Sequence, residues 1–261
     1  MSLTKQHNPV WFPLGDQALM LDFTGFRPVT SPDSLAENAD EIAQKIRSLS
    51  KRIAALNHAG ITDIVPALSR LMIRFDPATI STAQVKQILL PLIDAPFDKE
   101  EATGRHWLLP ICYDGDCGPD IEEVAERCHI SPEEVIERHL ACTLEVSVMG
   151  FMPGNGYMTG VDPSLTLPRR SNPRVAVPER SVGIAIGQCV IYPLTSPGGW
   201  HLIGRVAFPL FDTSRDEPIL LRTGDKVRFT RIDQEMLAHQ EAGYRSGRFT
   251  VNDLIDKSGA L

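Results

Sequence analysis

The sequence has 261 residues, a formal net charge of −7 and 43% hydrophobic residues. That length suits two domains, and the acidic balance argues against a general nucleic-acid binder, which normally carries a basic face. No apolar run is long enough to span a bilayer, and the N-terminus has neither the basic nor the apolar region of a secretion signal. The five cysteines are scattered through the chain. We therefore expect a cytoplasmic protein with reduced thiols.

The first hundred residues show the periodicities of alternating strands and helices. Five apolar residues fall on one helical stripe that ends before Gly60, namely Ile42, Ile46, Leu49, Ile53 and Leu56. Ser81 is suited to cap a second helix, which Pro91 is expected to end or kink. The predicted strands are 18–23, 61–65, 71–75 and 106–113, and residues 24–36 are expected to form a loop. The resulting βαββαβ order predicts a ferredoxin-like α/β domain over residues 1–100, although strand 106–113 also suits the following domain.

Two short helices are predicted next, each with a start signal. Asp120 and Glu123 have the spacing of a capping box, and Ser131-Pro132 places a cap before proline at the first helical position. We interpret the acidic residues here as partners of the helix dipoles and not as an acid–base pair. The spacing Cys112-x4-Cys117-x10-Cys128-His129 fits no standard zinc pattern, so the sequence predicts no metal site.

Residues 101–243 are predicted to form a β barrel or sandwich, since short apolar runs alternate with turns from Leu144 onward. The candidate strands are 146–149, 181–186, 189–194, 201–207, 219–221 and 226–232. A helix is expected over 235–242, and residues 244–261 have the composition of a polar tail. The whole chain is therefore predicted to be an α+β protein.

One stretch of this second domain, Gly150–Arg205, is rich in glycine and proline and carries five arginines. Glycine permits positive φ and proline fixes φ, so the stretch predicts successive tight turns that present side chains on a rigid surface. Arg169, Arg170 and Arg174 lie together between two prolines. Guanidinium groups on such a stiff loop indicate a clamp for a carboxylate or a phosphate. A scaffold of turns with solvated arginines is the alternative.

Short motifs occur in a fixed order over nearly the whole chain. They are Leu14-Gly15-Asp16, Val65-Pro66, Phe75-Asp76-Pro77, Cys112-Tyr113, Gly118-Pro119-Asp120, Gly150-Phe151-x-Pro153-Gly154, Pro168-Arg169-Arg170, Pro173-Arg174, Val177-Pro178, Ser181-Val182-Gly183-Ile184, Tyr192-Pro193, Ser196-Pro197-Gly198-Gly199-Trp200 and Ile203-Gly204-Arg205. With these motifs the sequence resembles subunit 1 of the allophanate hydrolase family, which includes the 5-oxoprolinase B-subunit and the sporulation kinase inhibitor KipI.

The resemblance implies a cyclophilin-like antiparallel β barrel behind a small α/β domain. It implies an enzyme component that acts with a second carboxyltransferase-like protein, of the type of allophanate hydrolase subunit 2 or the 5-oxoprolinase C-subunit. With a possible third subunit, such pairs cleave 5-oxoproline to glutamate with ATP. The sequence contains no phosphate-binding Gly-x4-Gly-Lys-Ser/Thr loop, so ATP is expected at a partner or a joint surface, and the isolated chain is expected to be inactive. A histidine kinase inhibitor and another urea carboxylase-like activity are the alternatives.

Such chemistry requires cationic groups, hydrogen-bond donors for a carboxylate and a group that moves a proton, and the chain offers candidates for each. His201 is the histidine of the motif stretch and the candidate for proton transfer, with a structural role on a barrel strand as the alternative. The expected substrate-binding residues are Arg169, Arg170, Arg174, Arg205, Tyr157, Gln188 and Tyr192.

The chain also departs from the family pattern at several positions. Asn155 replaces a usual aromatic residue, and Ile186, Cys189 and Val190 replace residues of a Gly-Gly-Gln-Thr-Gly motif. If these positions line the pocket, the shape of the substrate has changed or activity is lost.

Overall fold

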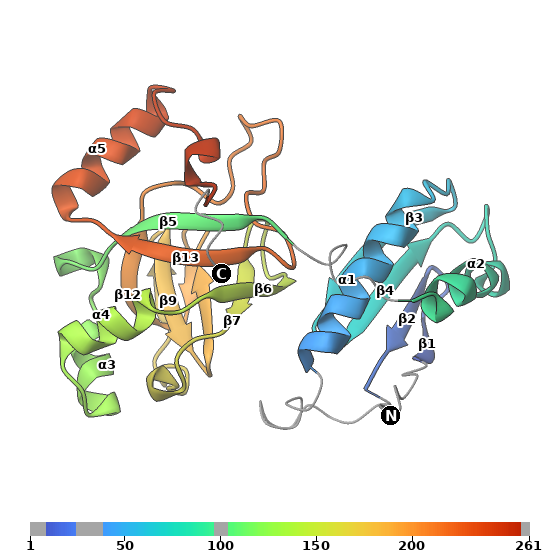
Figure 1. Cartoon of the computed structure of the whole chain (residues 1–261), viewed down its shortest axis with the longest axis horizontal. Coiled ribbons are helices and arrows are strands. Elements are labelled where there is room, and N and C mark those ends of the chain that lie inside the picture. The colour runs from blue at the N-terminus through green and yellow to red at the C-terminus, as the bar shows by residue number, and fades with distance from the viewer. Residues whose placement is uncertain (1–8, 25–38, 97–103, 257–261) are drawn as a thin grey trace. The chain divides into compact units, whose positions relative to one another are not determined.

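The computed structural model describes residues 9–24, 39–96 and 104–256 (Figure 1). The chain divides into two compact units, Met1–Thr103 and Gly104–Leu261. The first unit contains β1 (Val10–Leu14), β2 (Ala18–Asp22), α1 (Ala39–Ala55), β3 (Ile61–Ala67), β4 (Arg70–Phe75) and α2 (Thr82–Asp94). Its strands form an antiparallel sheet in the order β1-β2-β4-β3.

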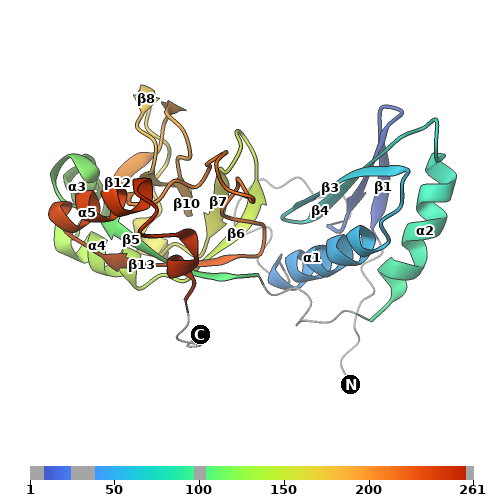
Figure 2. The ribbon, with the colours of Figure 1, turned by 90° about the horizontal axis from the view of Figure 1, so that it is seen from above.

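The core of the first unit follows from two periodicities. Alternate residues of β4, namely Leu71, Ile73 and Phe75, are buried, as expected for a strand with one face against a core. The predicted stripe of α1 supplies Ile46 and Ile53 to the same core, and α1 lies along the sheet beside α2 (Figure 2). The predicted cap of α2 is also confirmed: the Ser81 hydroxyl accepts a hydrogen bond from the backbone of Gln84.

The elements β2, α1, β3, β4, α2 and β5 (His106–Cys112) follow one another in the predicted βαββαβ order, but the last strand belongs to the second unit, which was the alternative for residues 106–113. There β5 pairs with β12 (His201–Val206) and β13 (Lys226–Arg231). The place beside β2 is taken by β1, which a short turn through Gly15 at φ +64 joins to β2. Adjacent strands joined by a tight turn pair at a small loop-closure cost. A ferredoxin-like domain is therefore not confirmed.

Two prolines do not stop the elements in which they occur. Helix α2 continues past Pro91 to Asp94, and strand β3 continues past Pro66 to Ala67. Residues 25–36 of the predicted loop lie outside the described residues.

The second unit contains a closed barrel with helices around it. Its elements are β5, η3 (Gly115–Cys117), α3 (Ile121–Cys128), α4 (Pro132–Leu140), β6 (Leu144–Met149), β7 (Gly156–Thr159), η4 (Pro163–Leu165), β8 (Arg174–Val177), β9 (Ser181–Ala185), β10 (Gln188–Ile191), β11 (Ser196–Gly198), β12, β13, α5 (Gln234–Arg245) and η5 (Val251–Leu254). The barrel order is β6-β13-β5-β12-β9-β10-β7, and β7 pairs with β6 to close it. This α+β architecture is consistent with the expected cyclophilin-like barrel, although β5 and β13 are parallel.

Two apolar clusters lie on opposite faces of the barrel strands. Cys189 and Ile191 of β10 belong to the main core. Val190, which lies between them, and Tyr192, which follows the strand, belong to a smaller cluster with Trp200. This alternation is the period of two that a pleated strand imposes. The strands β8 and β11 form a separate two-stranded ribbon, and Val177 of β8 packs into the smaller cluster. The smaller cluster therefore lies on the outer face of the barrel.

Part of the predicted polar tail, residues 244–261, makes apolar and backbone contacts with the barrel. Leu254 is buried, and Ile255 forms a bridge with Trp107 of β5. Helix α5 contacts β5, and the helices α3 and α4 lie side by side near one end of the barrel strands (Figure 1). The segment therefore packs on the barrel as far as Asp256.

His139 of α4 is fully buried in the main core. Its Nδ1 lies 2.7 Å from the Tyr113 hydroxyl, and its ring stacks on Phe229 with centroids 4.8 Å apart. Burial lowers the pKa of His139 from its ordinary 6.5 to about 4. A neutral imidazole accepts the hydrogen bond that the Tyr113 hydroxyl donates.

This burial predicts a pH dependence of stability. Below pH 6.5 the unfolded His139 binds a proton that the folded protein excludes until about pH 4, so stability falls as the pH falls through this window. Between pH 7 and pH 5 we expect the free energy of unfolding to fall by about 2 kcal/mol more in the wild type than in His139→Gln. Urea unfolding at both pH values measures this. The exposed His239→Gln should behave as the wild type, and an equal fall in all three proteins would contradict the prediction.

The turn between β9 and β10 has an unfavourable residue. Ile186 has φ +49 and Gly187 has φ +71, so both central residues of this hairpin are left-handed. Such turns favour Asn-Gly, whereas a β-branched residue in this region is strained. Ile186 is also solvent-exposed, so its side chain gains little from packing.

Replacing Ile186 with a residue that tolerates positive φ should stabilise the protein. We expect Ile186→Asn to raise the free energy of unfolding by about 1 kcal/mol, measured by urea titration. Ile186→Val keeps the β-branch and is the matched control, for which no gain is expected. Equal stability of the Asn and Val variants would show that the turn is not strained.

Candidate functional site

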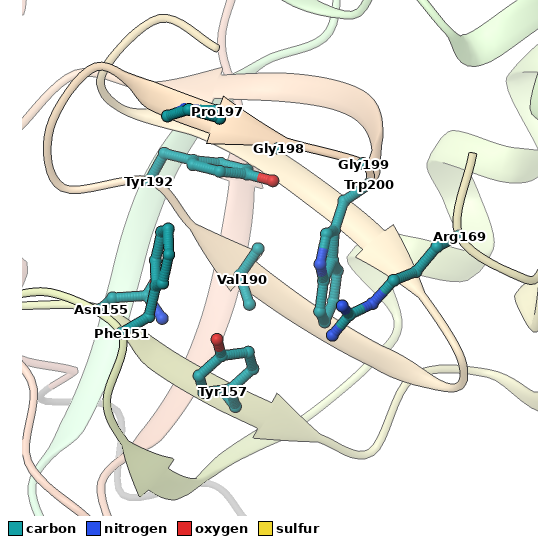
Figure 3. A pocket seen from close by; sticks show the side chains of 10 residues that line it. All are labelled: Phe151, Asn155, Tyr157, Arg169, Val190, Tyr192, Pro197, Gly198, Gly199 and Trp200. Atoms are coloured by element: carbon teal, nitrogen blue, oxygen red, sulfur yellow. The ribbon is translucent and has the colours of Figure 1, made fainter. Parts of the chain in front are cut away.

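A pocket of about 170 Å³ lies on the outer face of the barrel, over the smaller apolar cluster. It is lined by Phe151, Asn155, Tyr157, Arg169, Val190, Tyr192, Pro197, Gly198, Gly199 and Trp200 (Figure 3). Most of these residues come from β7, β10, the loop before β7, and the Ser196–Trp200 motif. The pocket is small for a ligand site, which suits a compact ligand.

Two tyrosines give the pocket its hydroxyl groups. Tyr157 and Tyr192 border it with Val190 between them (Figure 3). Burial raises the pKa of Tyr192 to about 12. The Tyr192 side chain therefore remains a neutral phenol at physiological pH, able to donate a hydrogen bond to a ligand.

Gly198 makes room for the Tyr192 ring. A Cβ atom at position 198 would lie 2.3 Å from the Tyr192 hydroxyl oxygen and 2.8 Å from its ring carbon Cζ. Glycine is thus required here for close approach of the ring to the backbone. The Ser196–Trp200 motif therefore fixes the position of Tyr192 as well as contributing Trp200 to the pocket.

Arg169 is the available positive charge of the pocket. Its guanidinium lies over the Trp200 ring, 5.6 Å from the centroid, in the geometry of a cation–π contact. The side chain is exposed, and none of the carboxylates in the described ranges forms an ion pair with it. A guanidinium without a carboxylate partner attracts an anionic ligand, and its fork geometry suits a carboxylate.

The other two arginines of the predicted clamp are already paired. Arg174 donates to both carboxylate oxygens of Asp120, at 2.6 Å and 2.8 Å, and this hydrogen bonding raises the pKa of Arg174. Arg170 donates to Asp120 at 3.2 Å and to Glu123. Burial raises the pKa of Glu123, but the hydrogen bond and charge of Arg170 outweigh it and leave that pKa lowered. Arg170 and Arg174 line no part of the pocket.

The carboxylate of Asp120 does not cap α3, so the predicted capping box is wrong at this helix. The Asp120 side chain makes no capping hydrogen bond because its oxygens bind the two arginines and the backbone N–H of Leu202. At α4, in contrast, the Ser131 hydroxyl caps the backbone of Glu134, as predicted.

His201 does not line the pocket. It pairs across the sheet with Ile184, a residue of the barrel core, so it faces away from its neighbour Trp200. Its Nε2 lies 3.0 Å from the carbonyl oxygen of Pro168, and its Nδ1 lies 3.7 Å from a carboxylate oxygen of Glu123. His201 therefore contacts the loop behind the pocket.

Two further predicted residues are also outside the pocket. Arg205 lies with its Nε 3.5 Å from Glu241 of α5, which also binds Arg180 at 2.9 Å. Gln188 is half-buried at the start of β10, where it pairs with Ala185 beside the hairpin turn.

Sequence reasoning missed some of the lining residues. Asn155 is buried and donates to the Gly150 carbonyl oxygen at 3.0 Å, which closes the loop before β7. Phe151, in the same loop, is exposed and has φ +74. Asn155 and Val190 both depart from the family pattern, and both line the pocket. These departures were the sequence signal that could have identified the two residues as part of the lining.

Within the described residues, no group of three His, Cys, Asp or Glu side chains is arranged to hold a metal ion. None of the described helices is long and apolar enough to cross a membrane.

The family model of the carboxyltransferase domain, subdomains C and D, matches residues 10–221. The chain belongs to this carboxyltransferase domain family. It is 33% identical over 236 residues to the 5-oxoprolinase B-subunit of Bacillus subtilis (strain 168), covering 85% of this chain and 92% of that protein. It is 46% identical over 129 residues to the 5-oxoprolinase B-subunit of Escherichia coli O157:H7, covering 49% of this chain and 59% of that protein.

A solved structure, that of TTHA0988, has a TM-score of 0.70 with this carboxyltransferase domain at 32% identity. The match covers 84% of this chain and 40% of that longer chain. The carboxyltransferase domain described here therefore corresponds to one part of the TTHA0988 polypeptide.

The packing of Tyr192 against Gly198 leads to a prediction. Gly198→Ala should lower the free energy of unfolding by about 1–3 kcal/mol, because the new methyl group overlaps the tyrosine ring. Gly199→Ala is the matched control, since its Cβ would meet Pro173 only at 3.6 Å, an ordinary contact. Urea unfolding of both variants measures the difference, and equal stabilities would contradict the role assigned to Gly198.

Proposed function

We propose that this chain is a subunit of an ATP-dependent amidohydrolase of the 5-oxoprolinase type, acting with a second carboxyltransferase-like subunit. The proposal rests on the likeness to the 5-oxoprolinase B-subunit over 92% of the Bacillus subtilis protein. The observation that carries it is Arg169, a cation without a carboxylate partner among the described residues, at a compact pocket with two phenol groups.

The lining of this pocket suits 5-oxoproline, a five-membered ring with one carboxylate and one amide. Arg169 is the proposed partner of the carboxylate, and the Tyr157 and Tyr192 hydroxyls are the proposed donors to the amide oxygen. The apolar ring carbons would pack against Trp200 and Val190. Val190 in place of a smaller family residue narrows the pocket floor and favours a small substrate.

No residue that lines this pocket is proposed to transfer protons or to bind phosphate. His201 is turned away from the pocket and engages the Pro168 carbonyl, so it is not proposed as the acid–base group. ATP, when bound to the assembled subunits, would supply the phosphoryl group that activates the amide oxygen. Because this sequence contains no phosphate-binding loop, the proposed ATP site is on the partner or on a surface formed with it.

The proposal is tested with the reconstituted subunits and ATP-dependent release of glutamate from 5-oxoproline. Arg169→Gln should lower kcat/KM roughly 10- to 100-fold, because a charge-assisted hydrogen bond to the substrate is lost. Arg248→Gln is the matched control, since Arg248 also lies over an aromatic ring, Phe249, at 5.2 Å but outside the pocket.

Two outcomes would contradict this proposal. Unchanged kcat/KM in Arg169→Gln would remove Arg169 from the site. No glutamate release by the wild-type assembly, together with co-purification of a histidine kinase, would favour the kinase inhibitor alternative.

A further inference from the structure

We infer that Asp120 is a positioning residue that holds Arg169 at the pocket, although Asp120 itself touches no part of the pocket. The positioning role itself does not depend on the proposed function, and only its test by enzyme kinetics rests on that function. Asp120 belongs to the Gly118-Pro119-Asp120 motif, which neither the helix cap nor the pocket lining explains.

The Asp120 carboxylate joins three separate segments of the barrel unit. It is 4% exposed and accepts hydrogen bonds from the side chains of Arg170 and Arg174 and from the backbone of Leu202. The Leu202 N–H lies 2.7 Å from Oδ2, and the Leu202 carbonyl in turn accepts from the Asp120 N–H at 3.0 Å. The start of α3, the loop at residues 170–174 and strand β12 are thus fixed together.

The residues on both sides of Arg169 are held. The Pro168 carbonyl lies 3.0 Å from Nε2 of His201 on β12. Arg170 is held by its side chain at Asp120, and its N–H donates to the Gly199 carbonyl at 2.7 Å. A residue between two fixed neighbours retains little backbone freedom, so Arg169 is directed toward the Trp200 ring (Figure 3).

The charges in this network also balance. Arg170 and Arg174 face Asp120 and Glu123, so two guanidinium groups meet two carboxylates. The guanidinium of Arg169 takes no part in these ion pairs and is therefore available to bind an anionic ligand. Replacing Asp120 with a neutral residue would remove the ion pair of Arg174 and leave Arg170 paired with Glu123 alone, which would loosen the loop that carries Arg169.

An experiment without substrate tests the positioning role. In Asp120→Asn we expect amide hydrogen exchange to accelerate roughly tenfold or more in residues 168–174 and 198–202, and to remain unchanged in β2 and β4. Asp225→Asn is the matched control: Asp225 is similarly buried and accepts hydrogen bonds from Arg105 and from the Trp107 ring, away from the pocket. In the Asp225→Asn variant, amide hydrogen exchange in residues 168–174 should be as slow as in the wild type.

The assembled subunits provide the second measurement. Asp120→Asn should raise the KM for 5-oxoproline roughly tenfold with little change in kcat, and Asp120→Glu should recover part of the loss. Asp225→Asn should leave KM unchanged. If Asp120→Asn does not fold, Arg174→Gln removes the other side of the same ion pair at a partly exposed position and should give the same pattern.

The two proposals fail in distinguishable ways. If the wild-type assembly releases no glutamate, the proposed function fails, but the exchange comparison still decides the role of Asp120. Wild-type exchange in residues 168–174 of Asp120→Asn, or equal acceleration in Asp225→Asn, would overturn the positioning role.

Discussion

The alternation of side chains along the barrel strands is the constraint on which this site depends. A closed barrel has an interior that must be filled, so every second residue of β10 and β9 is assigned to the main core. The residues between them face outward, and there Val190 and Tyr192 form the floor of the pocket with Trp200 from the neighbouring motif. A shift of one residue in the pairing of these strands would remove the pocket altogether.

Residues that are adjacent in the sequence are divided between the pocket and the contacts behind it. Trp200 and His201 are adjacent, yet one lies at the pocket and the other supports the loop behind it. Arg169 and Arg170 divide in the same way, because Arg170 is committed to Asp120. The result is two layers: side chains that line the pocket, and behind them an ion-pair network that holds the loop carrying Arg169.

Much of this could be predicted from the sequence, and the failures have physical causes. Periodicity located most barrel strands, and three of the candidate residues, Tyr157, Tyr192 and Arg169, do meet at one pocket. The pairing of Arg174 with Asp120 could not be predicted, since it joins residues 54 positions apart and no local spacing encodes it. Strand β1 was missed because it contains Pro13, which indicates a break, although proline is tolerated on an edge strand such as this one.

The ribbon of β8 and β11 has a short free edge to which another polypeptide strand could add. Among the described strands, β8 pairs with β11 alone, and its Val175 is 88% exposed. An apolar strand with an unpaired edge is a template onto which another polypeptide can add. Here Pro173 and Pro178 bracket the strand, and neither has an N–H to donate. The free edge is thereby limited to four residues, too short to nucleate an extended intermolecular sheet.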